Sequence, residues 1–174
     1  MAENKMTAKC KAIVIGGSSG SIDFLLKLLP TLQVPLSLVI ILVLHRKNSL
    51  ESTLAELFSS KTRIPVKEVE DKDVAEPGSI YVAPADYHLL IEKNHEFSLD
   101  TSEKVNFSRP SLDVTFESAA EVYGNTLVGV ILSGANADGS NGLKAIKQKG
   151  GLIIAQKPET AQVAYMPQQA ILNN

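Results

Sequence analysis

Three residues far apart in the chain, Ser18, His45 and Asp138, are of the types that together activate a serine hydroxyl. A serine hydroxyl is a weak nucleophile at neutral pH and needs a base within hydrogen-bond distance. The base works best when a carboxylate fixes its tautomer. Each of the three residues closely follows an apolar run, so the sequence predicts a Ser-His-Asp hydrolase if the fold brings the ends of these runs together.

Ser18 lies in a glycine-rich turn, Gly16-Gly-Ser-Ser-Gly20, between an apolar run and an amphipathic segment. This order predicts a strand, a tight turn and a helix. Free N–H groups and the positive end of the helix dipole gather at such a point, which suits a bound anion or a nucleophile. The turn matches the G-x-S-x-G pattern of α/β-hydrolases, although their chain order is Ser, Asp, His. The turn alone therefore leaves both possibilities open.

Simpler roles exist for each of these residues. Ser18 would serve equally as a turn or phosphate-contacting residue, His45 as a solvated side chain, and Asp138 as a cap of the helix that follows it. Their joint position after three strands favours the triad. His88 and His95 are expected at the surface.

Apolar and amphipathic segments alternate along most of the chain, and this pattern predicts a parallel α/β sheet. The continuous apolar run at 36–44 is typical of a strand buried on both faces. Segments 65–70, 79–83, 87–92 and 96–99 predict short strands that form a meander or hairpin at one edge. Further strands are expected near 11–15, 126–132 and 152–155, with helices after Gly20, Ser49, Ser111 and Ser140 and over 167–172. The expected fold is a three-layer, doubly wound, mostly parallel sheet with a small antiparallel edge meander. In this architecture functional groups collect at the carboxyl ends of the strands.

Composition narrows the function classes. The 174 residues are 44% hydrophobic and 21% charged, with a net charge of -2, which predicts one globular domain and argues against nucleic-acid binding. Cys10 is the only cysteine, which fits a cytoplasmic protein without disulfides. Residues 1–10 are expected to form a flexible leader, and no run reaches the ~20 apolar residues of a membrane helix. No spaced set of metal ligands is visible, so neither a metal nor a cofactor is predicted.

Several ordered motifs resemble the CheB-type protein-glutamate methylesterases of bacterial chemotaxis. The turn Gly16-Gly-Ser-Ser-Gly-Ser21 is similar to G-x-S-T-G-G, and Leu44-His45 stands where that family has Q-H-M-P. Further matches are Pro77-Gly-Ser-Ile-Tyr-Val-Ala-Pro-Ala-Asp86 to P-G-x-x-Y-x-A-P-x-D, Arg109-Pro-Ser-Leu-Asp113 to R-P-S-V-D, and Leu132-Ser-Gly-Ala-Asn-Ala-Asp-Gly139 to L-T-G-M-G-x-D-G. Ile154-Ala-Gln156 and Met166-Pro167 also follow the family order, so the resemblance covers about residues 11–172.

The resemblance implies hydrolysis of γ-glutamyl methyl esters on the cytoplasmic helices of chemoreceptors, with release of methanol, and in many members deamidation of receptor glutamines. It assigns Ser18 as the nucleophile, His45 as the base and then acid, and Asp138 as the residue that orients His45. It gives Ser19 a supporting contact to the histidine and assigns the backbone N–H of Ala135 to the oxyanion hole. Residues 11–174 are expected to form one catalytic domain, without the receiver domain that many relatives carry.

The chain departs from the family pattern near the expected site. Ser21 replaces glycine, Arg46 and Lys47 replace the M-P that follows the histidine, and Ala135-Asn136 replaces M-G. Two cations beside His45 are expected to lower its pKa. If the replaced glycine has a positive φ, Asn136 is the next most tolerant residue for that position.

Two alternatives remain at this point. One is a receptor-binding relative with an impaired site, because the loops are altered. The other is a nucleotide-binding module, because Gly16 and Gly20 partly match a dinucleotide turn. The last glycine of that motif is missing, however, and the second strand ends in Leu44-His45 rather than an acidic residue.

Overall fold

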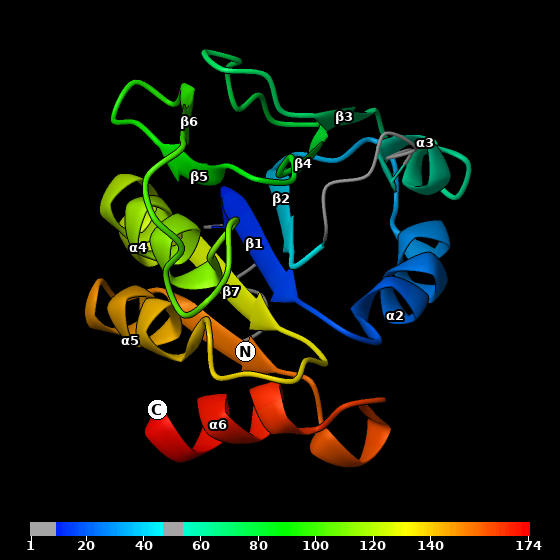
Figure 1. Cartoon of the computed structure of the whole chain (residues 1–174). Coiled ribbons are helices and arrows are strands. Elements are labelled where there is room, and N and C mark those ends of the chain that lie inside the picture. Colours follow the sequence, from blue (N-terminus) through cyan, green and yellow to red (C-terminus); the bar gives the residue numbers. More distant parts are fainter. Residues whose placement is uncertain (1–9, 47–53) are drawn as a thin grey trace.

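The computed structural model of the chain describes residues 10–46 and 54–174. Lys47, the expected cap Ser49 and nearly all of the expected leader lie outside this part. A six-stranded sheet with the order β3-β4-β2-β1-β7-β8 forms its centre, and all neighbouring strands are parallel (Figure 1). The strands are β1 (Ala12–Gly17), β2 (Val39–Leu44), β3 (Val66–Glu68), β4 (Ile80–Val82), β7 (Leu127–Ile131) and β8 (Leu152–Ala155). The expected parallel sheet is confirmed.

Helices cover both faces of the sheet and make the three layers. They are α2 (Ser21–Leu28), α3 (Leu54–Ser59), α4 (Leu112–Tyr123), α5 (Ser140–Gln148) and α6 (Tyr165–Asn173), with short 3-10 turns at Leu29–Thr31, Gly124–Thr126 and Pro158–Thr160. Figure 1 shows α2 and α3 on one side of the sheet and α4 and α5 on the other. Two hydrophobic clusters correspond to these two sides. No helix of the described residues is long and apolar enough to cross a membrane.

Strand β2 has the burial expected of a central parallel strand. All six of its residues are buried, because helices cover both faces of the sheet. The strand begins at Val39 rather than Leu36, since its pairing with β1 starts at Ala12 and Val39.

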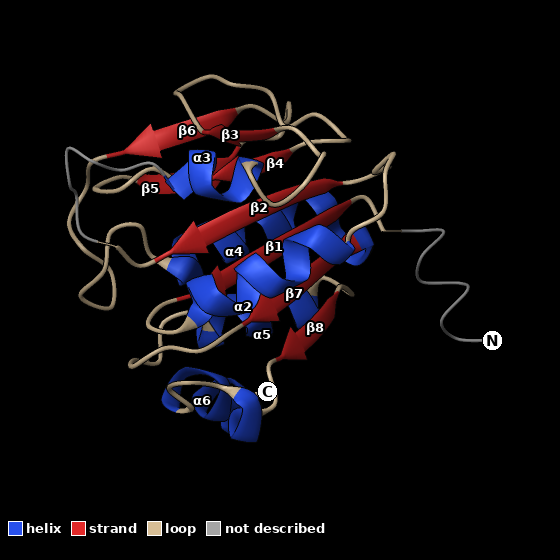
Figure 2. Cartoon of the chain, turned by 90° about the vertical axis from the view of Figure 1, so that its right-hand side faces the viewer, coloured by secondary structure: helices blue, strands red, loops and turns tan. Residues whose placement is uncertain are grey.

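The antiparallel part of the fold is smaller than the sequence indicated. Among the strands of residues 10–46 and 54–174, only β5 (His88–Ile91) and β6 (Phe97–Asp100) form an antiparallel hairpin, which is a separate two-stranded sheet (Figure 2). Strands β3 and β4, which the sequence grouped with this hairpin, belong to the main sheet and run parallel to each other. Short apolar runs bounded by turn residues do not by themselves distinguish a parallel neighbour from an antiparallel one.

Candidate active site

The ends of three adjacent strands bring the expected site residues to one edge of the sheet. Strand β1 lies between β2 and β7, with Gly17 opposite Leu44. Beyond the strands, the N–H of His45 donates to the carbonyl of Gly17 at 3.0 Å, and the N–H of Ser18 donates to the carbonyl of Ser133 at 2.8 Å. Ser18 and His45 therefore continue neighbouring strands at the same level.

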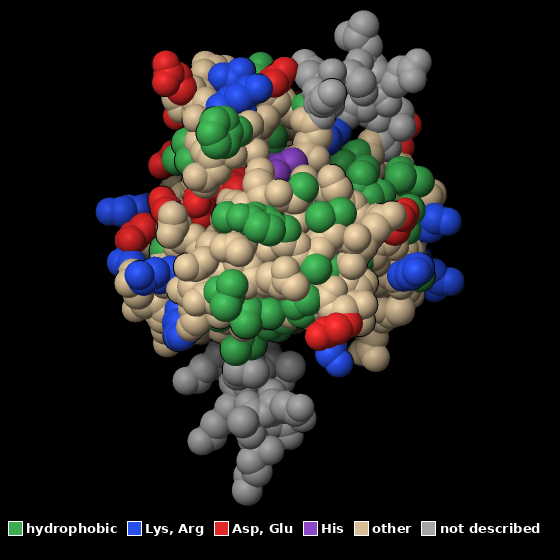
Figure 3. Space-filling model, turned by 60° about the horizontal axis from the view of Figure 1, so that its bottom comes forward, with side chains coloured by type: hydrophobic (Ala, Val, Ile, Leu, Met, Phe, Trp, Pro, Cys, Tyr) green, Lys and Arg blue, Asp and Glu red, His purple; other side chains and the backbone are tan. Residues whose placement is uncertain are grey.

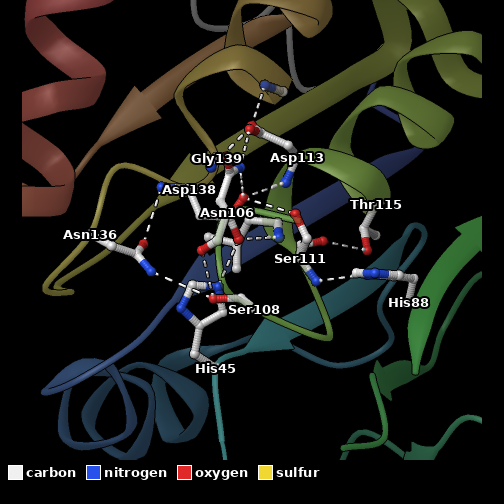
Figure 4. A network of polar contacts seen from close by, with 12 residues as sticks. His45, His88, Asn106, Ser108, Ser111, Asp113, Thr115, Asn136, Asp138 and Gly139 are labelled. Atoms are coloured by element: carbon white, nitrogen blue, oxygen red, sulfur yellow. Dashed lines mark hydrogen bonds and ion pairs between the residues drawn. The ribbon is translucent and has the colours of Figure 1, made fainter. Parts of the chain in front are cut away.

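His45 is paired directly with Asp138. The imidazole Nε2 lies 2.7 Å from the carboxylate Oδ2 of Asp138, although 93 residues separate the two in the chain (Figure 4). A carboxylate only accepts hydrogen bonds, so Nε2 carries the proton. The Nδ1 of the neutral ring is then the nitrogen with a free lone pair, and it is the atom able to accept a proton.

The carboxylate of Asp138 is buried and saturated with hydrogen-bond donors. Besides His45, its donors are the side chains of Asn106 at 2.8 Å and Ser111 at 2.9 Å and the backbone N–H groups of Leu112 at 2.6 Å and Asp113 at 3.2 Å (Figure 4). Burial raises the pKa of Asp138, but the hydrogen bonds from His45, Asn106 and Leu112 outweigh that effect, and the pKa lies below its ordinary value. The site therefore holds Asp138 as an anion.

Two of these donors belong to the N-terminus of α4. The first N–H groups of a helix have no partner within the helix. Ser111 is the N-cap of α4, but its side chain makes no capping hydrogen bond. The carboxylate of Asp138 supplies the missing acceptor, and the helix dipole favours its charge. Asp138 thus caps α4, and not α5, the helix that follows it in the chain.

Ser18 lies in a tight turn that is closely packed against neighbouring residues. Gly20 has a φ of +84, and a Cβ there would come within 2.5 Å of the Cβ of Gln162, so a side chain does not fit. The hydroxyl of Ser21 donates to the carbonyl of Ser18 at 2.5 Å, which gives the residue that replaces a family glycine a defined place in the turn. Within the described residues, no hydrogen bond joins the Ser18 hydroxyl to His45. Such contacts are often long in free enzymes and tighten when substrate binds.

The loop after β7 faces the same edge. Gly134 is fixed by two backbone hydrogen bonds, from its N–H to Val163 at 3.0 Å and from the N–H of Met166 to its carbonyl at 2.9 Å. The next residue, Ala135, is exposed, and its N–H has no acceptor among the residues described. Such a donor suits an oxyanion, and this role of Ala135 stays a prediction.

The contact expected of Ser19 is not found in the described part of the chain. Its side chain is exposed, and no hydrogen bond joins its hydroxyl to His45. Its carbonyl instead accepts a hydrogen bond from Ser133 at 2.6 Å, which ties the Ser18 turn to the loop after β7. A supporting role for the Ser19 hydroxyl stays a prediction.

The residues near His45 that differ from the family pattern make hydrogen bonds with residues other than His45. The guanidinium of Arg46 lies 2.6 Å from the carboxylate of Glu68 and 3.2 Å from the carbonyl of Ala83. The side chain of Asn136 accepts from the N–H of Asp138 at 3.1 Å, and Asn136 is not among the described residues with a positive φ. Its tolerance of a left-handed backbone is therefore not what places it there.

Sequence reasoning missed part of the network and misplaced one histidine. Asn106, Ser111 and Asp113 bind the carboxylate of Asp138, and only the R-P-S-V-D match pointed to that region. His88, expected at the surface, is 1% exposed. Its Nε2 donates to the carbonyl of Glu103 at 2.8 Å, and its Nδ1 accepts from the N–H of Ser111 at 3.2 Å. His95 is exposed, as expected.

The site edge is visible from outside. Figure 3 shows histidine atoms that reach the surface, with hydrophobic and charged side chains nearby. His45 lines a hollow of about 590 Å³ together with Arg46, Asp86, Lys104 and residues 107–110. The imidazole is thus open to a molecule that enters this hollow.

Residues 13–174 match the family model of CheB methylesterase. The chain belongs to the CheB methylesterase family. This decides against the nucleotide-binding alternative and confirms the resemblance seen in the sequence motifs.

Relatives and a solved structure agree with this assignment. A protein of Leptospira interrogans is 48% identical over 92% of this chain and 83% of its own length. A Thermotoga maritima protein, described as a protein-glutamate methylesterase/protein-glutamine glutaminase, is 37% identical over 92% of this chain and 48% of its own length. The chain thus spans about half of that relative. The crystal structure of the Thermotoga maritima CheB methylesterase catalytic domain matches with a TM-score of 0.89 over 94% of this chain and 88% of that one, at 37% identity.

Proposed function

We propose that this member of the CheB methylesterase family hydrolyses γ-glutamyl methyl esters of chemoreceptors in the cytoplasm, releasing methanol, and that it deamidates receptor glutamines. The observation that carries the proposal is the 2.7 Å contact of His45 with the buried carboxylate of Asp138, beside the strand end that bears Ser18. Residues 11–174 would act as one catalytic domain on the cytoplasmic helices of the receptor.

The first step is attack by the Ser18 hydroxyl on the ester carbonyl. Nδ1 of His45 takes the hydroxyl proton, and Nε2 keeps its own proton on the hydrogen bond to Asp138. The anionic carboxylate stabilises the imidazolium that forms. The tetrahedral intermediate carries its negative charge on the former carbonyl oxygen, which would accept a hydrogen bond from the N–H of Ala135.

The intermediate then collapses to an acyl-enzyme. The C–O bond to the methoxy group breaks, and the imidazolium gives its proton to that oxygen, so that methanol leaves. Water attacks the acyl-Ser18 ester, and His45 takes a proton from it. The bond between the acyl carbon and Ser18 Oγ then breaks, the imidazolium returns the proton to Oγ, and the glutamate carboxylate is released. A glutamine side chain follows the same path with ammonia as the leaving group.

Methanol release from methylated chemoreceptor membranes tests this proposal. The parent is expected to release methanol, Ser18→Ala to lose the activity, and Ser37→Ala, a matched change at an exposed serine, to keep it. Equal release by parent and Ser18→Ala would assign the nucleophile elsewhere. No release by a folded parent that still binds the membranes would favour the impaired receptor-binding relative.

A further inference from the structure

A tight turn beside the site has an unusual backbone. Val105 and Ser108 exchange two backbone hydrogen bonds, of 3.1 and 3.0 Å. The two residues between them, Asn106 and Phe107, have φ values of 53 and 62. Asparagine tolerates this left-handed region, but a bulky residue such as phenylalanine is a genuine outlier there. Such a conformation persists only where surrounding contacts determine it.

The anchor of the turn is the side chain of Asn106. Its amide nitrogen donates one hydrogen bond to Asp113 Oδ2 at 2.7 Å and one to Asp138 Oδ1 at 2.8 Å (Figure 4). Both carboxylates are buried, with Asp113 5% and Asp138 1% exposed. The two amide hydrogens of asparagine are thus both used, each on one carboxylate. An otherwise exposed loop is thereby fixed to the partner of His45.

Phe107 is what this anchored turn presents to solvent. It is 97% exposed, although an aromatic ring of this size gains much from burial. It lines the same hollow as His45. A chain segment that enters this hollow can therefore contact the ring, whose exposed surface is available to an apolar group of that segment.

We propose that the turn at 105–108 recognises the substrate. Phe107 contacts an apolar side chain on the receptor helix next to the modified glutamate, and Asn106 connects the turn to the Asp138–His45 pair. The proposal rests on the proposed function. On a helix, the side chains three and four positions from the glutamate share its face, and one of these is the expected partner of the ring. Phe107 is then a specificity-determining residue and Asn106 a positioning residue.

The two residues predict different kinetic defects. Phe107→Asn removes the ring and keeps a residue that tolerates a positive φ. With methylated receptor membranes, we expect its KM to rise about tenfold, the loss of one good apolar contact, with kcat nearly unchanged. With N-acetylglutamic acid γ-methyl ester, which has no helix, parent and variant are expected to release methanol at equal rates. An unchanged KM on membranes, or an equal defect with the small ester, would overturn the role of Phe107.

Asn106→Gly keeps the left-handed turn and removes only the amide. We expect kcat to fall about tenfold or more on receptor membranes, and the acid limb of the rate profile to move to higher pH. A carboxylate with one donor fewer holds the imidazolium more strongly. The proton NMR signal of the His45 Nε2–H is expected to shift as well. Asn94→Gly, a like change in the exposed turn of the β5–β6 hairpin, is the matched control and should leave these readouts unchanged.

A lower melting temperature of Asn106→Gly with kcat, pH profile and His45 signal unchanged would make Asn106 merely structural and overturn its positioning role. Failure of the parent to release methanol from membranes would instead contradict the proposed function. The two failures are therefore distinguishable.

Discussion

Asp138 and Asp113 each hold the N-terminus of the other's helix. The Asp138 carboxylate, just before α5, accepts the N–H groups of Leu112 and Asp113 at the start of α4. The Asp113 carboxylate, on α4, accepts the N–H groups of Gly139 at 3.0 Å and Gly142 at 2.7 Å at the start of α5. The N-termini of α4 and α5 are thus held next to each other, and this fixes the position at which Asp138 contacts His45.

The two carboxylates differ in their affinity for protons. Burial raises the pKa of Asp113 against the hydrogen bond from Gly142, and the charge of Asp138 raises it further. The pKa of Asp138 is lowered. A proton that enters this buried pair therefore goes to Asp113 first and leaves Asp138 ionised for His45.

Asp138→Asn is expected to remove nearly all activity. One carboxylate oxygen becomes an NH₂ group, which faces donors and favours the wrong imidazole tautomer. We expect kcat to fall by about 10³- to 10⁴-fold and the melting temperature to drop. Asp71→Asn is the matched control, because Asp71 is exposed, does not line the hollow, and the asparagine carbonyl still accepts the N–H of Leu99. Steady-state methanol release and thermal unfolding measure both effects, and comparable losses in the two variants would contradict this role of Asp138.

The pH dependence of the unfolding free energy should also reflect the lowered pKa of Asp138. A carboxylate whose pKa is lowered by folding contributes stability that is complete above its unfolded value, about 3.9, and is lost as pH falls through the folded value. The difference in unfolding free energy between the parent and Asp138→Asn is therefore expected not to shrink between pH 7 and about 4 and to shrink below that. Urea titrations at a series of pH values measure it. A difference that shrinks already above pH 5 would mean that Asp138 is not held as an anion.

The fold could be predicted because the hydrophobic pattern of a strand is visible within a few consecutive residues of the sequence. Val39–Leu44 is continuously apolar, and a strand buried on both faces requires this. The residues Ser18, His45 and Asp138 could be named because each follows such a strand, and parallel strands end at one edge of the sheet. The candidate site could therefore be predicted from the residue types together with their positions directly after strands.

The rest of the site depends on the path of a loop. Asn106 reaches Asp138 across 32 residues, and no periodicity reports such a contact. His88 was misplaced for a related reason. Its two partners, the carbonyl of Glu103 and the N–H of Ser111, lie in and after the loop that follows β6. An isolated polar residue in a short strand gives no sign of such partners.

Position 139 is expected to require glycine for two reasons: the backbone has a positive φ there, and the close packing leaves no room for a Cβ. It has a φ of +98, and a Cβ there would lie 2.4 Å from Ile131 Cδ1. Gly78 has a similar φ of +93, but the nearest atom to its Cβ would be the carbonyl oxygen of Leu36 at 3.3 Å. Alanine at either position meets the same backbone penalty, so the difference between the two variants isolates the overlap. We expect Gly139→Ala to lose about 1–3 kcal/mol more unfolding free energy than Gly78→Ala.

This pair of variants also tests whether helix placement matters for catalysis. The N–H of Gly139 binds Asp113, so a shift there displaces Asp138 as well. Gly139→Ala is expected to lower kcat, whereas Gly78→Ala should keep it. Urea denaturation and methanol release measure the two effects. Equal losses of stability would show that the site absorbs the extra methyl group without strain.

His88 is expected to support the site through Ser111. Its Nδ1 accepts the N–H of Ser111, whose hydroxyl donates to Asp138 at 2.9 Å. In His88→Asn, an asparagine at position 88 is too short to keep the hydrogen bond to Glu103, so the carbonyl of Glu103 loses this donor and the buried side chain loses its partner. We expect a loss of about 1–3 kcal/mol in unfolding free energy. His95→Asn, at an exposed histidine with a φ of 66, is the matched control and should cost less than His88→Asn, because it removes only a ring contact with Tyr123, 5.3 Å between centroids. Urea denaturation of both variants measures this, and an unchanged stability of His88→Asn would show that the buried ring has no such role.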